Sequence, residues 1–393
     1  SSVQINGGQL SYNAPDSFPV HLDNISLKAS NISIDGTGFL LTASMQAIGG
    51  QQFTVDTYIA VVVDNNSVQS LSLSDLAVGL NNIEISGSIE ASNSLSFIQG
   101  NLQTNSFSLV QQLQRAAEIL PIISVPEMAD PSALTDVSIE SRFSLDTAAV
   151  SDINNLLMLD GQAIVINLQI DQPRNKLTTL VSADVIKASN YLPKSDSNAD
   201  NSGLFAPLAI PFALWQGQSQ VEMTIGSVQF NDFAVDNVYS NVFGNNSVLR
   251  IASLNADLFG GQINATGRLD MRSATPVFEL QNSLANIDLE LALPALADSS
   301  DLSGLLSLDA SLRGSGNSQE EILSALSGEG ELSVLSPTYL AINAEETFCN
   351  AAALFGGGSS NKTWSKGTKL ETLSSQFSLD NGKVLISDLK TAT

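Results

Sequence analysis

The chain has 393 residues, of which 14% are charged and 43% are hydrophobic, and its formal net charge is −24 at pH 7. A single compact core does not grow to this length, so we expect two or three units or one elongated body. The hydrophobic fraction excludes a disordered acidic tail. The negative charge argues against binding of nucleic acid and against electrostatic docking on an anionic lipid surface.

Alternation of apolar and polar residues predicts β-strands along the whole chain. Each strand has one apolar face and one face of Ser, Asn, Asp and Thr, which is typical of antiparallel sheet with one solvated side. The alternating apolar positions are Ile25, Leu27 and Ala29; Leu71 and Leu73; Ile83 and Ile85; Ile164, Ile166, Leu168 and Ile170; Val221, Met223 and Ile225; Ile287, Leu289, Leu291 and Leu293; Leu306, Leu308, Ala310 and Leu312; and Val384 and Ile386. We therefore expect a mainly β fold: an elongated twisted antiparallel sheet, either a curled groove or sandwich-like, with a few short helices.

Helical periodicity is confined to short segments. Residues 108–120 carry one apolar stripe, and Ser108 is placed to cap their N-terminus. Ser318 and Glu321 form a capping box that begins a second helix, with Gly328 as its stop. The remaining helical predictions cover residues 343–355 and a part of 147–158.

A polar segment divides the chain into two regions of similar length. Residues 194–203 contain glycine and lack large apolar side chains, so they predict a linker. Before it lies an N-terminal β-rich region, residues 1–193, with its helix near 108–120. After it lies a C-terminal β-rich region, residues 204–393.

Membrane and targeting signals are sparse. The longest strongly apolar stretch is residues 207–215, about half of the roughly 20 residues that span a bilayer. The chain begins without Met and ends within a strand-like pattern, so we expect a segment of a longer protein, truncated at both ends, whose anchor lies outside it.

Catalytic and metal-binding patterns find no support in the residues. A nucleophilic triad or a zinc site would depend on His21 and Cys349, the single histidine and the single cysteine. Residues 196–207 lack the glycine and glutamate of a calcium loop, and residues 356–363 lack the glycine that precedes the lysine of a phosphate loop. Pairs of carboxylates carry no specificity, because 40 acidic residues make chance pairs inevitable. We therefore expect no enzyme, no cofactor and no metal.

Glycine-containing hairpins and strands recur in a fixed order through the second half. The segments are LNADLFGGQINATGRLD (254–270), LSGLLSLDASLRG (302–314), ILSALSGEG (322–330), FCNAAAL (348–354) with TWSKGTKL (363–370), and FSLDNGKV (377–384). In their order and spacing they resemble the AsmA family of Gram-negative envelope proteins. Residues 5–12 and 22–27 are similar to shorter recurring units of the same family.

The resemblance implies a sheet on the periplasmic side of the inner membrane, anchored there by a membrane helix outside this segment. It also implies a bridge-like lipid carrier with an apolar groove and a role in outer-membrane assembly. The implied partners are a phospholipid or another envelope lipid and outer-membrane assembly proteins. The groove candidates are Ile164, Ile166, Leu168, Val221, Met223, Ile225, Ile287, Leu289, Leu306 and Leu308.

A closed core would explain the same alternating residues. An open groove holds an acyl chain through about 0.8 kcal/mol per buried CH₂ and needs no charged group. A dry core would instead indicate an exported structural or interaction scaffold, such as an adhesin-like module. An enzyme ranks third, behind both of these interpretations.

Overall fold

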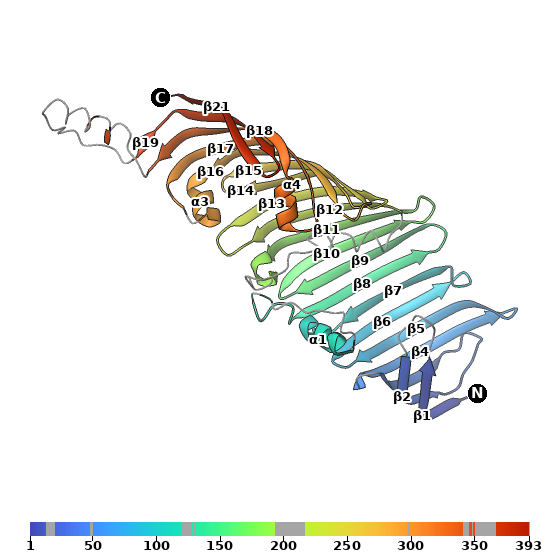
Figure 1. The fold of residues 1–393 in the computed structure, drawn as a ribbon. Helices are drawn as coiled ribbons and strands as arrows, with labels where there is room; N and C mark the ends of the chain where they lie inside the picture. Colours follow the sequence, from blue (N-terminus) through green and yellow to red (C-terminus); the bar gives the residue numbers. More distant parts are fainter. Residues whose placement is uncertain are drawn as a thin grey trace. The chain divides into compact units, whose positions relative to one another are not determined.

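Most strands pair antiparallel with the next strand in the sequence (Figure 1). The computed structural model describes residues 1–12, 20–47, 50–119, 128, 130–192, 217–297, 299–340, 346–347, 349 and 367–392. The chain divides into two units, one of Ser1–Asp184 and Ala188–Asp196 and the other of Val185–Lys187 and Ser197–Thr393. This division falls within residues 194–203, which lie outside the described residues, so the linker there stays a prediction.

Unit 1 contains a meander in which each strand pairs with the next. Its strands are β1 (Val3–Tyr12), β2 (Val20–Ala29), β3 (Phe39–Ala47), β4 (Gln52–Asp64), β5 (Ser67–Leu80), β6 (Ile83–Ser92), β7 (Phe97–Thr104), β8 (Val137–Asp146), β9 (Val150–Leu159), β10 (Gln162–Asp171) and β11 (Lys176–Lys187), of which the last three residues are assigned to unit 2. Helix α1 (Leu109–Ile119) connects β7 to β8, and the 3₁₀ helix η2 (Ala188–Tyr191) follows β11.

Unit 2 repeats this architecture. Its strands are β12 (Gln218–Gln229), β13 (Ala234–Asn245), β14 (Val248–Leu258), β15 (Gly261–Asp270), β16 (Val277–Asp288), β17 (Leu302–Ser315), β18 (Ser327–Tyr339), β19 (Thr368–Lys369), β20 (Thr372–Asp380) and β21 (Lys383–Ala392). Both β19 and β20 pair with β18, and β21 pairs with β20. Helix α3 (Leu289–Ala297) lies between β16 and β17, and α4 (Gln319–Ala325) lies between β17 and β18.

Tight hairpins set the register of several strand pairs. Two-residue loops of type I′ require positive φ at both positions, and their twist matches that of the flanking strands. Such loops occur at Asn65–Asn66, Asp160–Gly161, Asn246–Ser247, Phe259–Gly260 and Asn381–Gly382, with φ between 47° and 79°. Asn, Asp and Gly tolerate this conformation best, so the local sequence favours a hairpin at most of these points.

The sheets are open and form a single layer. The mainly β antiparallel fold predicted from the sequence is confirmed, and the sandwich-like alternative is wrong for the described strands, which do not close on themselves or form a second sheet. Among the described residues no large side chain is fully buried, as a covering layer would require. No helix of the described chain is long and apolar enough to cross a membrane.

Two helix predictions are confirmed at their N-termini. The Ser108 hydroxyl accepts a hydrogen bond from the Gln111 amide at 3.3 Å, and α1 follows it. The Ser318 hydroxyl accepts from the Glu321 amide at 3.2 Å. The Glu321 carboxylate accepts from the Asn317 amide at 2.7 Å. In a capping box this carboxylate accepts from the amide of the cap residue, here Ser318, so the reciprocal bond is shifted by one residue.

Gly328 does not end helix α4, contrary to the prediction. The helix ends at its C-cap, Leu326, and Gly328 lies within β18. A Cβ atom at Gly328 would lie 2.2 Å from the carbonyl oxygen of Ser311 on β17. Glycine is therefore needed here for close approach of two strands.

Two other elements differ from the sequence expectation. Leu289, Leu291 and Leu293 belong to α3 instead of a strand, because this Leu- and Ala-rich run favours a helix and Asp288 caps it by accepting from the Glu290 amide at 2.9 Å. The expected helix within residues 147–158 is strand β9, because β8 and β10 pair with it on both sides. The helix predicted at 343–355 lies mostly outside the described residues.

Ser318→Ala tests the cap of α4. We expect a loss of about 1 kcal/mol in the free energy of unfolding, because the Glu321 amide loses its acceptor. Urea denaturation followed by circular dichroism measures the change. The exposed Ser311 on β17 provides the control, and a Ser318→Ala midpoint equal to that of Ser311→Ala would contradict the cap.

Tyr191 predicts a stability change at high pH. Burial and then the charge of Asp160 raise the pKa of the phenol to about 12, although the Gln162 amide donates to its oxygen at 2.5 Å. The folded state thus retains a proton that the unfolded state loses near pH 10, so stability falls as the pH rises from about 10 to about 12.

Tyr191→Phe should remove this step from an ultraviolet titration and weaken the loss of stability. Tyr58→Phe should leave the step in place. Persistence of the high-pH step in Tyr191→Phe would assign it to another residue.

Candidate functional site

Unit 2 has one almost entirely apolar face, which we call apolar face 2. Directly paired residues of antiparallel strands share a face, so the register assigns each side chain to one side of the sheet. Apolar face 2 comprises Val221, Met223 and Ile225 (β12); Val238 and Val242 (β13); Leu249, Ile251, Leu254 and Ala256 (β14); Ile263, Ala265 and Leu269 (β15); Phe278, Leu280, Leu284 and Ile287 (β16); Leu306, Leu308, Ala310 and Leu312 (β17); Leu332 and Val334 (β18); and Leu373, Phe377 and Leu379 (β20). Its polar members include Ser219, Ser240, Asn282, Ser375 and Thr391, and Val384 and Ile386 of β21 also belong to it.

Burial separates apolar face 2 from the other side of the sheet. The buried apolar strand residues of unit 2 all belong to it: Ile225, Val238, Leu249, Ala256, Ala265, Leu269, Ile287, Ala310 and Val334. Larger side chains between them, such as Met223 and Leu308, remain half-buried. The side chains of apolar face 2 therefore shield one another only in part, and some of their apolar surface remains in contact with solvent.

Unit 1 has a corresponding apolar face 1. Around β10, Ile164 pairs with Leu157 and Ala183, and Leu168 pairs with Ile153. The other members include Phe53, Val55, Ile59 and Val61 (β4); Leu71, Leu73, Val78 and Leu80 (β5); Ile83, Ile85, Ile89 and Ala91 (β6); Ile98 and Leu102 (β7); Val137, Ile139, Phe143 and Leu145 (β8); and Ile166, Ile170 and Val181 (β10 and β11).

Nine of the ten groove candidates lie on these two faces. Ile164, Ile166 and Leu168 lie on apolar face 1, and Val221, Met223, Ile225, Ile287, Leu306 and Leu308 lie on apolar face 2. Ile287 pairs directly with Leu306, whereas three strands separate the β12 residues from Ile287 and four separate them from Leu306. The tenth, Leu289, is the first residue of α3 and is buried beside the end of that face.

Sequence reasoning missed several members of apolar face 2. Leu254 was missed because a bulge between Ile251 and Leu254 shifts the alternation of β14 by one residue. Leu280 and Leu284 were missed because Asn282 interrupts the run in β16. The spacing of Phe278, Leu280 and Leu284 retains the period of two, so a search that allowed one polar interruption would have found them.

Aromatic rings on the apolar faces cover glycines of the neighbouring strand. A Cβ at Gly330 would lie 2.6 Å from Cζ of Phe377, and one at Gly314 would lie 2.7 Å from Cζ of Phe278. In unit 1 the same arrangement joins Gly100 and Phe143, at 2.8 Å. These pairs extend the apolar surface across positions without a side chain and fix the ring positions.

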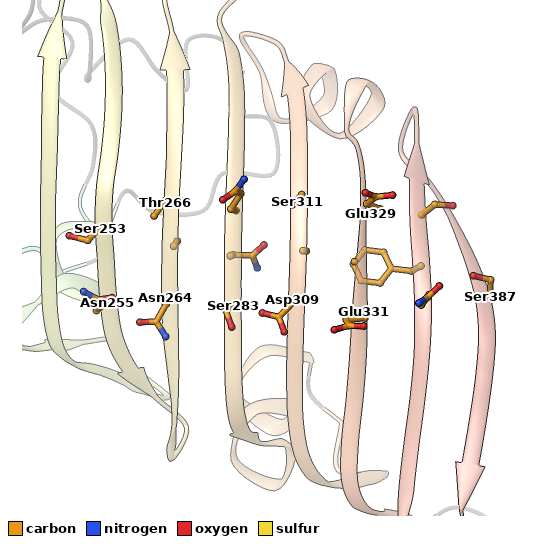
Figure 2. A pocket seen from close by; sticks show the side chains of 18 residues that line it. Ser253, Asn255, Asn264, Thr266, Ser283, Asp309, Ser311, Glu329, Glu331 and Ser387 are labelled. Atoms are coloured by element: carbon orange, nitrogen blue, oxygen red, sulfur yellow. The ribbon is translucent and has the colours of Figure 1, made fainter.

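The opposite face of unit 2 is polar and contains a shallow hollow of about 880 Å³ (Figure 2). Figure 2 shows Asn264, Ser283, Asp309 and Glu331 in one row across neighbouring strands. In the described part of the chain, no group of three His, Cys, Asp or Glu side chains is arranged to hold a metal ion. The lining contains Asp309, Glu329 and Glu331 beside Ser, Thr, Asn and Gln residues, and Ala265, Asn282, Ala310 and Phe377 also contribute to it.

The AsmA family model matches residues 21–389. The match extends through the first half of the chain, where the recognisable motifs were short, and it confirms the family suggested by the second half. Neither the search of curated proteins nor the search of solved structures found a match.

Ile225→Asp tests the burial of apolar face 2. Ile225 is only 5% exposed, so a carboxylate there would be desolvated without a partner, and we expect a loss of at least about 3 kcal/mol of stability. Thr224→Asp is the matched control, because residue 224 is exposed on the same strand. Equal melting temperatures for the two variants would show that Ile225 does not contribute to a buried face.

Proposed function

The chain belongs to the AsmA family, and on that premise we propose that it is a non-enzymatic envelope protein that binds the acyl chains of lipids along its apolar faces. We further propose that it acts on the periplasmic side of the inner membrane, carries a phospholipid or another envelope lipid between the two membranes and supports outer-membrane assembly.

The observation that carries this proposal is an extended apolar face without a second layer of sheet. Residues such as Val221, Met223 and Leu308 are half-buried by their neighbours and remain accessible. Covering apolar surface contributes about 25 cal/mol per Å², and each buried CH₂ of a lipid chain contributes about 0.8 kcal/mol. A lipid chain laid on the face therefore supplies the packing that a second sheet supplies in a sandwich.

The polar surface is compatible with this function. The charge of −24 belongs mainly to exposed positions, such as Asp309, Glu329 and Glu331 on the hollowed face. Acyl-chain binding depends on apolar contact and needs no attraction between the protein and a headgroup. A scaffold with a dry core, the alternative function, would require a layer over the apolar faces, and the described strands form none.

The test is lipid uptake by the delipidated protein. The protein is exposed to phospholipid vesicles, separated from them, and its bound lipid is extracted and identified by mass spectrometry. We expect at least one diacyl phospholipid to co-purify. Lack of uptake under conditions in which an established lipid carrier is loaded would refute the proposed function.

A pair of variants on β17 locates the binding surface. Leu308→Asp places a carboxylate on apolar face 2, and Ser311→Asp places the same group on the polar face of the same strand. We expect Leu308→Asp to lower lipid uptake about tenfold or more, because a charge would have to be desolvated beneath the chain. Ser311→Asp should take up lipid like the wild type. Equal uptake by both folded variants would place the lipid elsewhere.

A further inference from the structure

Asn282 is a polar residue near the centre of apolar face 2. On the neighbouring strands it pairs with Ala265 and Ala310, both of which are buried. Along β16 its nearest neighbours on the same face are Leu280 and Leu284. The Asn282 amide therefore lies between two small side chains of the neighbouring strands and two leucines of its own strand.

The Asn282 amide has an unsatisfied acceptor. Its Oδ1 atom is buried, and no hydrogen-bond donor reaches it among the described residues. Buried amide oxygens in proteins nearly always have a partner, because an unpaired one destabilises the fold.

Asn155 is an asparagine on apolar face 1 whose amide nitrogen is bonded to the sheet. It pairs with Ser141 and Ile166, and its Nδ2 atom donates to the carbonyl oxygen of Ile166 at 3.2 Å. An asparagine can thus be accommodated on such a face by bonding to the sheet itself. The Asn282 oxygen is an acceptor and needs a donor. No described residue supplies one, which points to a donor from outside the protein.

We infer that Asn282 recognises a hydrogen-bond donor carried on the acyl chain of a bound lipid. This inference rests on the proposed function and specifies the lipid: a chain with a hydroxyl or amide N–H group, in preference to an unsubstituted chain. The terminal torsion of an asparagine side chain is soft, so Oδ1 turns toward the ligand at little energetic cost. A charged donor is excluded, because it would lose its hydration against the surrounding leucines.

Direct binding measurements test the inference. A saturated fatty acid and its β-hydroxy analogue of equal length compete for the delipidated protein, and both are quantified by mass spectrometry. One net neutral hydrogen bond in an apolar site corresponds to a preference of up to about tenfold. We expect the wild type to prefer the β-hydroxy acid by roughly that factor.

Asn282→Leu should remove the preference while it retains binding of the unsubstituted acid, and it should raise the melting temperature by removing the unpaired amide. Asn282→Ala provides a second variant that also lacks the amide and adds no bulk. The matched control is Asn264→Leu, which places the same side chain on the polar face of β15. Asn264→Leu should keep the wild-type preference.

The outcomes separate the two proposals. If the wild type binds both acids equally, or if both Asn282 variants keep the preference, Asn282 does not select the lipid and only the proposed function stands. If the wild type binds neither acid and takes up no phospholipid, the proposed function fails and this inference fails with it.

Discussion

The central constraint on this structure is that a single layer of antiparallel sheet leaves one apolar face without a partner layer. In a sandwich, the side chains of two inner faces interdigitate and exclude water. Here most strands of each unit pair with the next strand in the sequence, and the described residues place no second sheet over them. Side chains on one face can then be shielded only by neighbours on the same face, which explains why Ile225 is buried while Met223 remains half-buried.

This constraint connects the local features of the two units. The glycines at 100, 314 and 330 let aromatic rings lie flat across neighbouring strands, so that gaps in the apolar faces are filled without a covering layer. Small residues such as Ala265 and Ala310 are buried, at 8% and 7% exposed, among the larger side chains of apolar face 2. Asn282 lies between them, and its buried oxygen without a hydrogen-bond partner destabilises the fold.

The two sides of each sheet have separate physical roles. The polar side carries serine, asparagine and acidic residues and keeps a strongly negative chain in solution. The apolar side carries the surface on which the proposed lipid function depends. Because side chains alternate between the sides along every strand, a substitution at one position and its neighbour probes the two roles independently. The pairs Ile225 with Thr224 on β12 and Leu308 with Ser311 on β17 use this property.

The sequence by itself determined the element type over most of the chain and the face of most candidate residues. Period-two runs such as Ile164, Ile166 and Leu168 have a single physical interpretation, because only a strand places alternate residues on one side. The helix caps at Ser108 and Ser318 could also be predicted from the sequence, because their hydrogen bonds join residues three positions apart. The family was also readable, since it depends on the order of motifs along the chain.

Only the tertiary structure decided the features that depend on neighbouring strands. Bulges shift the register of β14, so Leu254 joins apolar face 2 against the simple alternation. An apolar face has the same alternating sequence pattern whether or not a second sheet covers it. The open single layer was decided by which strands pair, and pairing is a property of the whole chain.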